Sequence, residues 1–314
     1  MHRFGKRPDI TLIQLRNFVV AAELGSMTWA AEELYVAQSA VSTSISNLEQ
    51  ALGARLVIRS RGRGLQVTDK GAELLQRARR ILADVDEAVG AVSPENTAGR
   101  VSVGCFRTLA PFYLPTIITA LSARHPEVEV DVHELFAPQI GERLQDETIE
   151  IALTYDLGLG PEVEREVLAS VPMYVAVGRD HPLATRDAVS LAELESEPMV
   201  LLDLPVSRDY FLEAFTRLGL RPTVRFRFEN FEAVRAMVAS GHGYTVLNQQ
   251  PKLEYTYAGS ALRRLEIREP VAPLDLVLAR ARTQSRRSRR SELFAHECRR
   301  AVATHAVGQE APGR

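Results

Sequence analysis

The sequence predicts a small all-α domain with a helix-turn-helix at the N-terminus, followed by a larger α/β domain. Three observations support this prediction. Apolar residues recur every three or four positions over residues 10–52, which is the period of amphipathic helices. Over residues 100–304, short apolar segments alternate with helical patterns, which is typical of α/β domains. A long helical pattern over residues 69–93 separates the two parts, and 314 residues exceed one typical domain.

The composition is that of an ordinary globular protein, with 46% hydrophobic and 25% charged residues. It excludes a disordered chain, a collagen-like repeat and a small disulfide-stabilised scaffold. The two cysteines, Cys105 and Cys298, form neither a disulfide framework nor a metal-binding spacing, as expected in a reducing compartment. The N-terminal residues lack the apolar core of a signal peptide, and no apolar run approaches 18 residues. We therefore expect a cytoplasmic protein that does not enter a membrane.

The net charge of −2 conceals an asymmetry between the two parts of the chain. Residues 1–80 hold 12 Lys and Arg against 7 Asp and Glu, whereas residues 81–314 hold 26 against 33. A basic N-terminal part on an acidic body is expected if that part binds an anionic partner such as nucleic acid. The alternative is a charged surface that only contacts water.

Three helices are expected in the first domain, and the last two form the helix-turn-helix. They cover residues 10–24, 28–35 and 38–52. Gly25 ends the first helix, and the small residues Ala30 and Ala31 allow two short helices to cross closely. The outward face of the third helix carries short polar side chains, which are Gln38, Ser39, Ser42, Thr43 and Ser46. Gln can hydrogen-bond an adenine edge in the major groove, and Ser and Thr are adaptable donors and acceptors. The alternative is a polar helix face against water.

A hairpin wing is expected after the third helix. Residues 55–58 and 65–68 are two short β-prone segments, and a Gly- and Arg-rich tip joins them. Alternating Gly and Arg lets such a tip approach a phosphate backbone or a minor groove closely. The candidate contact residues are Arg59, Arg61 and Arg63.

Residues 30–71 resemble the DNA-binding domain of LysR-type transcriptional regulators, a bacterial family. The matching residues are Ala30, Ala31, Leu34, Gln38, Ser39, Ala40, Val41, Ser42, Leu48, Glu49, Leu52, Gly53, Leu56, Arg59, Leu65, Thr68 and Gly71. The family often has Pro at Ser39, Arg or Gln at Thr43, and Phe at Val57. The short Thr43 side chain reaches fewer base atoms than an Arg would. The resemblance implies a winged helix-turn-helix that reads double-stranded promoter DNA.

The helix over residues 69–93 carries a heptad row of apolar residues, which are Leu75, Ala78, Leu82, Val85, Val89 and Val92. Such a row predicts a helix that pairs with the same helix of a second subunit. The alternative is packing on its own domain. The family resemblance agrees with a dimer, and it further implies a homotetramer of paired dimers. Residues 93–99 contain Pro94 and Gly99 and form the hinge.

The larger domain resembles the effector-binding domain of the same family, which is a two-lobed, periplasmic-binding-protein-like fold. We expect largely parallel sheets, in which ligands bind at the carboxyl ends of strands. The resemblance places the effector site at Arg107, Thr108, Thr154, Tyr155, Ser207, Arg208 and Asn248. Hydroxyl and amide groups beside helix N-termini suit a carboxylate, with Arg107 or Arg208 as its ion-pair partner. The identity of this small-molecule effector stays open.

No motif of a known catalytic class is present: the sequence lacks GxSxG, HExxH, GxxxxGK[ST] and CxxC patterns. We therefore expect no enzyme, no metal and no cofactor besides the effector. Cys105 is either a buried thiol or a redox sensor, and the pattern favours the buried thiol.

The sequence thus predicts a LysR-type transcription factor that binds DNA sites with dyad symmetry and responds to a small, anionic effector. RNA polymerase is a possible further partner. The predicted domain boundaries are 10–67 for the DNA-binding domain, 68–98 for the linker helix and hinge, 99–304 for the effector-binding domain and 305–314 for a tail. The alternative is a cytosolic solute-binding or enzymatic α/β protein whose basic N-terminal domain only mediates assembly.

Overall fold

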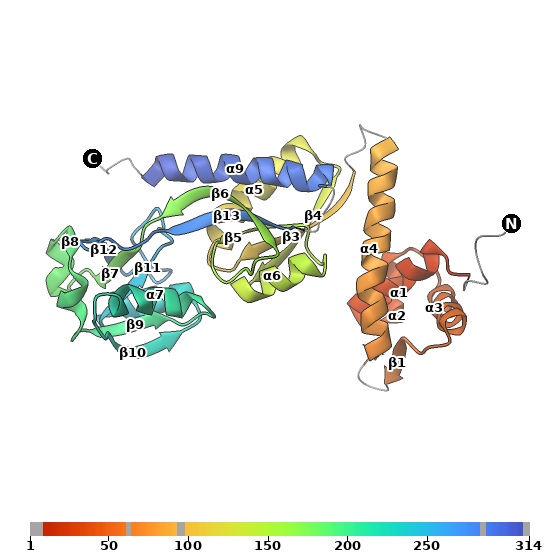
Figure 1. The fold of residues 1–314 in the computed structure, drawn as a ribbon, viewed down its shortest axis with the longest axis horizontal. Helices are drawn as coiled ribbons and strands as arrows, with labels where there is room; N and C mark the ends of the chain where they lie inside the picture. Colours follow the sequence, from red (N-terminus) through yellow and green to blue (C-terminus); the bar gives the residue numbers. More distant parts are fainter. Residues whose placement is uncertain (1–8, 61–63, 93–97, 283–286, 310–314) are drawn as a thin grey trace. The chain divides into compact units, whose positions relative to one another are not determined.

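A computed structural model describes residues 9–60, 64–92, 98–282 and 287–309 (Figure 1). The chain divides into two compact units, Met1–Asn96 and Thr97–Arg314, and each has its own hydrophobic core. The first unit is helical apart from one hairpin, and the second alternates strands and helices. The predicted fold class of both parts is confirmed.

The first unit contains the three expected helices, the hairpin and the long helix. Their bounds are α1 Leu12–Leu24, α2 Met27–Glu33, α3 Gln38–Leu52, β1 Val57–Ser60, β2 Gly64–Val67 and α4 Asp69–Val92. Gly25 adopts φ 60° at the end of α1, and the Ser26 hydroxyl accepts a hydrogen bond from the Trp29 N–H at the start of α2. The turn between α2 and α3 places Tyr35 at φ 55°, an uncommon left-handed conformation for a residue other than glycine.

Helix α3 is held by an apolar row that faces α1 and α2. Val41, Ile45 and Leu48 are completely or almost completely buried, and Phe18 of α1 lies in the same core. Ala30 of α2 is also fully buried, so a larger side chain there would force the helices apart. This packing leaves the polar face of α3 exposed.

The first half of α4 packs on its own domain, which corrects the expectation that its whole apolar row pairs with a second helix. Leu75, Ala78 and Leu82 belong to the core of the first unit, and Ala78 is fully buried. Arg79 also pairs with Glu23 of α1 at 2.9 Å. The physical reason is that α1 lies against α4 and uses these positions for the domain core. Val85 is half-buried, and the Val89 and Val92 side chains lie outside the described residues.

The second unit consists of two lobes, each built on one sheet. Lobe one holds β3 Gly99–Phe106, α5 Ala110–Arg124, β4 Val128–Leu135, α6 Ala137–Gln145, β5 Ile151–Tyr155, β6 Val163–Val171, β13 Leu274–Ala281 and α9 Arg289–Gln309. Lobe two holds β7 Tyr174–Gly178, η1 Pro182–Thr185, β8 Ala188–Val189, η2 Leu191–Leu194, β9 Pro198–Leu202, α7 Ser207–Thr216, β10 Thr223–Phe228, α8 Phe231–Ala239, β11 Tyr244–Leu247 and β12 Leu262–Ile267. The chain crosses between the lobes after β6 and again before β13.

Both sheets are mixed, which corrects the expectation of largely parallel sheets. In lobe one the strand order is β4-β3-β5-β13-β6, and β13 pairs antiparallel with both of its neighbours. In lobe two the order is β10-β9-β11-β7-β12-β8, and β7 runs antiparallel to β11 and β12. The antiparallel pairs follow from the two crossings, because β7 enters lobe two and β13 returns from it.

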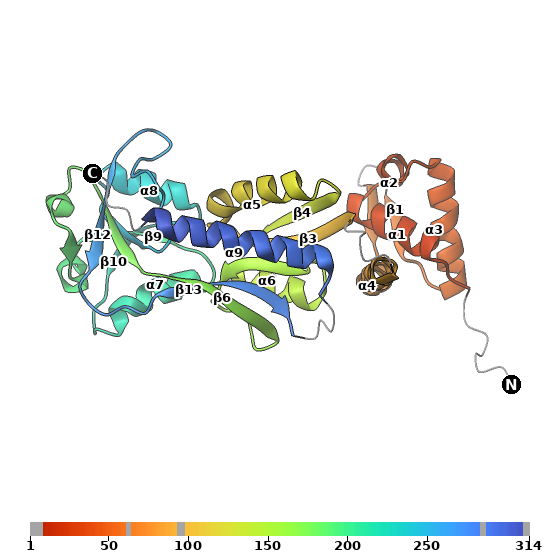
Figure 2. The same cartoon turned by 90° about the horizontal axis from the view of Figure 1, so that it is seen from above.

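Helices cover both faces of each sheet. In lobe one, α5 and α9 lie on one face and α6 on the other (Figure 1). In lobe two, α7 and α8 lie on opposite faces (Figure 2). The strands β5, β7 and β11 are buried over their whole length because each is covered on both sides.

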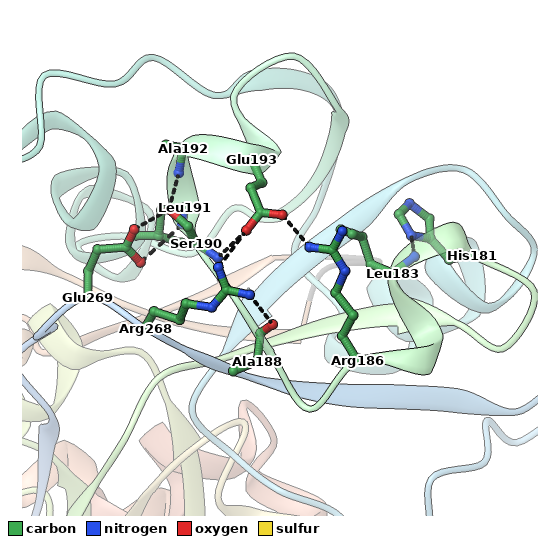
Figure 3. A network of polar contacts seen from close by, with 10 residues as sticks. All are labelled: His181, Leu183, Arg186, Ala188, Ser190, Leu191, Ala192, Glu193, Arg268 and Glu269. Carbon is green, nitrogen blue, oxygen red and sulfur yellow. Dashed lines mark hydrogen bonds and ion pairs between the residues drawn. The ribbon is translucent and has the colours of Figure 1, made fainter.

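A polar network closes the end of lobe two that carries β8 (Figure 3). Glu193 accepts hydrogen bonds from Arg186 and from Arg268, the latter at 3.0 Å. Glu269 accepts from the Ser190 hydroxyl and, at 3.1 Å, from the Leu191 N–H. The hydrogen bond from the Ser190 N–H, together with the Arg186 guanidinium, lowers the pKa of Glu193. These contacts hold the short helices η1 and η2 against β12.

A prediction concerns Gly71, in the first turn of α4. Its N–H donates to the Thr68 hydroxyl at 3.0 Å, and a Cβ atom there would lie only 2.1 Å from the Leu56 carbonyl oxygen. Because backbone cannot move away easily, Gly71→Ala should destabilise the first unit by about 1–3 kcal/mol. The matched control is Ala72→Ser at the exposed neighbouring position, which should cost about 0.5 kcal/mol. Denaturant unfolding followed by the fluorescence of Trp29, the single tryptophan, measures both; equal midpoints would contradict the prediction.

Candidate functional site

The exposed face of α3 carries the polar residues that the sequence singled out. Gln38, Ser39, Thr43 and Ser46 are exposed, and Ser42 is half-buried. The first turn of α3 contains no acidic residue, and Ala37 makes no side-chain cap. The N–H groups at this helix end are therefore compatible with an approaching anion, such as a phosphate.

Two exposed aromatic residues lie beside this face and were not identified as surface residues from the sequence. Trp29 of α2 is 62% exposed, and Tyr35 in the turn is 96% exposed. Helical spacing alone places Trp29 next to the buried Ala30 on the same helix. Only the packing shows that the Trp29 ring lies outside the core.

The hairpin wing forms as expected, with β1 and β2 antiparallel from Val57 opposite Val67 to Ser60 opposite Gly64. Arg59 lies in β1 opposite Leu65, but its side chain is outside the described part of the chain. Arg61 and Arg63 also lie outside the described residues.

Four of the seven residues proposed for the effector site line one cavity between the lobes, here called the inner cavity. Thr108 and Tyr155 come from lobe one, and Ser207 and Asn248 come from lobe two. Its open volume is about 20 Å³, enough for about one water molecule. All four residues are at least nine-tenths buried.

The other three residues of that set point elsewhere. Thr154 is fully buried, and its hydroxyl donates a hydrogen bond to the Tyr155 carbonyl. Neighbouring residues of a strand face opposite sides of the sheet, so Thr154 does not face the cavity that Tyr155 lines. Arg208 is exposed and pairs with Asp203 at 3.1 Å, because the helix turns it away from Ser207. Arg107 lies 4.2 Å above the Phe136 ring and is exposed.

A hydrogen-bond network surrounds the inner cavity and joins the lobes. The Tyr155 hydroxyl donates to the Gln249 Oε1 at 3.1 Å, and the Tyr174 hydroxyl donates to the Gln249 carbonyl at 2.9 Å. The Asn248 Nδ2 donates to the Val171 carbonyl at 2.9 Å and to the Tyr210 hydroxyl at 3.1 Å. Gln249 is a functional candidate that sequence reasoning missed, although it directly follows Asn248 at a strand end.

One polar atom in the cavity wall is unsatisfied. The Asn248 Oδ1 is buried and has no hydrogen-bond partner among the residues that the structure describes. The two donor bonds of Nδ2 fix the orientation of the amide, so Oδ1 faces away from them as an acceptor. A buried acceptor without a partner is costly, and a donor from a bound molecule would satisfy it.

Burial determines the protonation of the tyrosines at this junction. It raises the pKa of Tyr155 well above its usual value, and the neighbouring Tyr113 and Tyr174 hydroxyls raise it further. Burial also raises the pKa of Tyr113 to about 12. Both phenols therefore stay protonated near neutral pH, and Tyr155 remains a hydrogen-bond donor to Gln249.

Two helices begin at the inner cavity without a side-chain cap. Helix α5 starts two residues after Thr108, and α7 starts at Ser207. Val206, which precedes α7, adopts φ 68°, a strained conformation for a β-branched residue. A Cβ atom at Gly158 of lobe one would lie 3.0 Å from a Val206 methyl group, so the two lobes touch at this point.

Comparisons with known proteins identify both units. The family model "LysR substrate binding domain" matches residues 94–303, and the model "Bacterial regulatory helix-turn-helix protein, lysR family" matches residues 12–72. The chain belongs to the LysR family of transcriptional regulators. It is a DNA-binding transcriptional regulator with an N-terminal helix-turn-helix and a C-terminal substrate-binding domain. Membership in this family implies that the protein binds DNA and forms oligomers.

Individual relatives agree with this assignment. This LysR-family regulator is 31% identical to the HTH-type transcriptional regulator YvbU of Bacillus subtilis (strain 168) over 76% of this chain and 82% of that protein. It is 27% identical to the transcriptional activator protein LysR of Escherichia coli (strain K12), over 83% and 85%. The crystal structure of HinK, a LysR family transcriptional regulator from Pseudomonas aeruginosa, matches with 32% identity and a TM-score of 0.62, over 94% of this chain and 99% of that one.

No helix within the described residues of this regulator is long and apolar enough to cross a membrane.

The network at the inner cavity leads to a prediction for Tyr155→Phe. Removing the hydroxyl leaves the buried Gln249 Oε1 without this donor and should lower the free energy of unfolding of the effector domain by about 1–2 kcal/mol. Tyr244→Phe is the matched control, because the buried Tyr244 hydroxyl has no partner among the described residues and its loss should be neutral or stabilising. Urea unfolding followed by circular dichroism measures both variants. A Tyr155→Phe variant as stable as the control would contradict the role of this hydrogen bond.

Proposed function

We propose that this regulator responds to a small carboxylate that also carries a hydroxyl group and binds in the inner cavity. The observation that carries the proposal is the unpartnered, buried Asn248 Oδ1, which can accept a hydrogen bond from a bound molecule. The Thr108 and Ser207 hydroxyls supply donors for a carboxylate, and the uncapped ends of α5 and α7 favour negative charge.

Binding at this place couples the effector to the angle between the lobes. The inner cavity holds about one water molecule, so a larger effector needs the lobes to move apart. Its walls come from both lobes, which are joined by the two crossings of the chain. A ligand that binds one arrangement of the lobes better shifts the population toward it, and this shift is the signal that we propose reaches the DNA-binding units.

A non-covalent effector is favoured over oxidation of a thiol. A hydrogen peroxide-inducible genes activator from Pectobacterium carotovorum subsp. carotovorum is 30% identical to this chain, over 74% of this chain and 78% of that protein. In this chain, burial raises the pKa of Cys105 and that of Cys298 far above the usual range. Reactive cysteines need a low pKa and access to solvent, so these two thiols are poor peroxide sensors.

The effector domain binds its ligand without transforming it, in this proposal. The described residues that line the inner cavity carry hydroxyl, phenol and amide groups, with no histidine, carboxylate or thiol among them. Proton transfer at a bound substrate needs such a group as general base. We therefore propose a regulatory role in the cytoplasm, without catalysis.

We further propose that α4 pairs two subunits and that two such dimers form a tetramer on DNA. After α4 has packed on its own domain, Ile81 remains 42% exposed and Val85 half-buried, which leaves apolar surface for a second helix. Paired helix-turn-helix units bind sites with dyad symmetry, and α3 would read the bases through Gln38, Ser39, Ser42, Thr43 and Ser46. The wing residues Arg59, Arg61 and Arg63 would contact phosphates, and RNA polymerase is the further partner expected of a bound regulator.

The DNA-binding role predicts a selective effect of Gln38→Ala. The loss of a base contact should reduce the preference for the specific site by about 1–3 kcal/mol, with little effect on random duplex DNA. Gln50→Ala is the matched control, since Gln50 is also exposed on α3 but lies at its C-terminal end. Footprinting and fluorescence anisotropy on the DNA upstream of the regulator's own gene measure both. Equal losses on specific and random DNA would refute the base contact, and an affinity that does not fall by about 10³–10⁵ between 50 and 200 mM salt would refute extensive phosphate contacts.

The effector proposal predicts that hydroxycarboxylates bind better than either group alone. Isothermal titration of the full chain with glycolate, lactate and malate should show binding that acetate and ethanol do not match. Ser207→Ala should weaken it about tenfold, as expected for the loss of a hydrogen bond to a charged group. Ser122→Ala, at an exposed position of α5, is the control. Equal binding by wild type and Ser207→Ala, or a response to acetate as strong as to glycolate, would contradict the proposal.

A further inference from the structure

The chain enters the effector domain at Ala98 and Gly99, here called the linker entry, and the protein holds it there from two sides. The Gly99 N–H donates to the Glu127 carbonyl at 3.0 Å, directly before β4. From the other side, the Arg290 Nη1 of α9 donates to the Ala98 carbonyl at 3.3 Å. The linker entry is therefore held between the start of β4 and the start of α9.

The backbone of Gly99 is shaped to accept the Arg290 side chain. Gly99 adopts φ 127°, a conformation that residues with a Cβ atom rarely take. A Cβ atom at this position would lie 3.2 Å from the Arg290 Nη1 and 3.5 Å from its Cζ. The guanidinium thus lies directly against the backbone of the linker entry. It keeps this place although its buried Nε has no hydrogen-bond partner in the described part of the chain.

The start of α9 is itself fixed on lobe one. The Ser288 hydroxyl donates to the Glu150 carboxylate and accepts from the Ser291 N–H at 3.1 Å, which caps the helix. Further along, Phe294 is fully buried, and the helix packs along α5 (Figure 2). The position of Arg290 is therefore set by the packing of α9 on lobe one.

The opposite end of α9 contacts lobe two. The His305 ring lies 5.0 Å from the Tyr113 ring of α5. A hydrogen bond joins His305 to the Gln250 carbonyl, and Nδ1–H is its donor because Nε2 has no partner among the described residues. Burial and the Lys252 cation lower the pKa of His305, so the ring is neutral near neutral pH. Gln250 directly follows Gln249 of the network between the lobes.

One helix therefore touches both the junction of the lobes and the linker entry. Arg290 and His305 are 15 positions apart, which is about 22 Å along an α-helix. Packed helices shift as rigid units by about 1–2 Å in many allosteric transitions. A shift at the lobe junction can reach the linker entry through such a helix without being lost in a loop.

We infer that Arg290 is a positioning residue that fixes the direction in which the linker leaves the effector domain, and that α9 makes this direction depend on the junction of the lobes. With the guanidinium in place, the backbone at residue 99 is held in one conformation. A change between the lobes then turns the linker instead of being dissipated by free rotation at a glycine. The inference names the element that carries the signal, and to that extent it rests on the proposed function.

Distances between the two units test the role of Arg290. Spin labels on Gln76→Cys in α4 and Ser122→Cys in α5, both at exposed positions, report distances within one subunit when labelled chains are diluted with unlabelled protein. The native Cys105 and Cys298 are fully buried and should stay unlabelled. Arg290→Ala should broaden the distance distribution at least about twofold, because Gly99 then populates both signs of φ. Equal widths in the variant and the wild type would overturn the role of Arg290.

Two further variants separate a specific contact from a general loosening of α9. Arg290→Lys keeps a donor for the Ala98 carbonyl but loses the planar contact with Gly99, so its distribution should have an intermediate width. Arg300→Ala removes an exposed arginine of the same helix and should keep the wild-type width. Unchanged unfolding midpoints would show that all three variants are folded. Broadening in Arg300→Ala as large as in Arg290→Ala would overturn the specific role.

Hydrogen exchange at the linker entry tests the coupling through α9. His305→Ala removes the contact with lobe two and should speed exchange of the Gly99 amide at least about threefold, although the two residues lie at opposite ends of the helix. Ala303→Ser, at an exposed position of the same helical turn, is the matched control and should leave the exchange unchanged. Exchange in His305→Ala equal to that of the control would overturn the coupling.

These measurements separate this inference from the proposed effector, because neither of them uses an effector. A wild-type protein that does not bind glycolate would refute the proposed effector and leave the distance and exchange results unaffected. Glycolate binding together with equal widths in Arg290→Ala and wild type would overturn the inference and leave the proposed effector in place.

Discussion

The return of the chain from lobe two to lobe one is the constraint on which the effector domain depends. In lobe one, β5 and β6 do not pair with each other. Strand β13 lies between them and pairs with β6 over residues 274–281 and with β5 over residues 276–279. The sheet of lobe one is therefore incomplete until the chain has passed through lobe two. Contacts of such long sequence separation make folding slow, but they also tie the two lobes into one unit. The two crossings lie beside each other. A change in the angle between the lobes would therefore alter the structure at this junction.

That junction is unusually polar for a buried region. Asn248 and Gln249 are almost fully buried, and hydroxyl groups of Tyr155, Tyr174 and Tyr210 surround them. Most of their polar atoms are satisfied within the protein, and the Asn248 Oδ1 is the exception. An apolar filling would stabilise the closed lobes more and would bind nothing. Keeping hydroxyls and amides here costs stability, and these are the groups to which we assign the proposed effector.

The two units differ in the side chains that they expose at their candidate binding surfaces. In the DNA-binding unit, a short apolar row on α3 fixes the helix, while its opposite face carries uncharged polar side chains of the kind that suit base edges. The first part of α4 is committed to this unit through Ala78 and Leu82, which ties the direction of the linker helix to that of α3. In the effector domain, by contrast, charged and aromatic groups gather where the lobes meet.

The sequence by itself determined the helix-turn-helix, the hairpin and the strand–helix alternation, because each depends on spacing between neighbouring residues. It also brought Thr108, Tyr155, Ser207 and Asn248 forward as strand-end and helix-start positions. Only the tertiary structure decided that these four meet while Arg107 and Arg208 turn away, since side-chain direction depends on helix rotation and on partners such as Phe136. The apolar row of α4 was ambiguous for a related reason. The spacing shows that one face of the helix is covered, but only the packing shows whether its own domain or a second helix covers it.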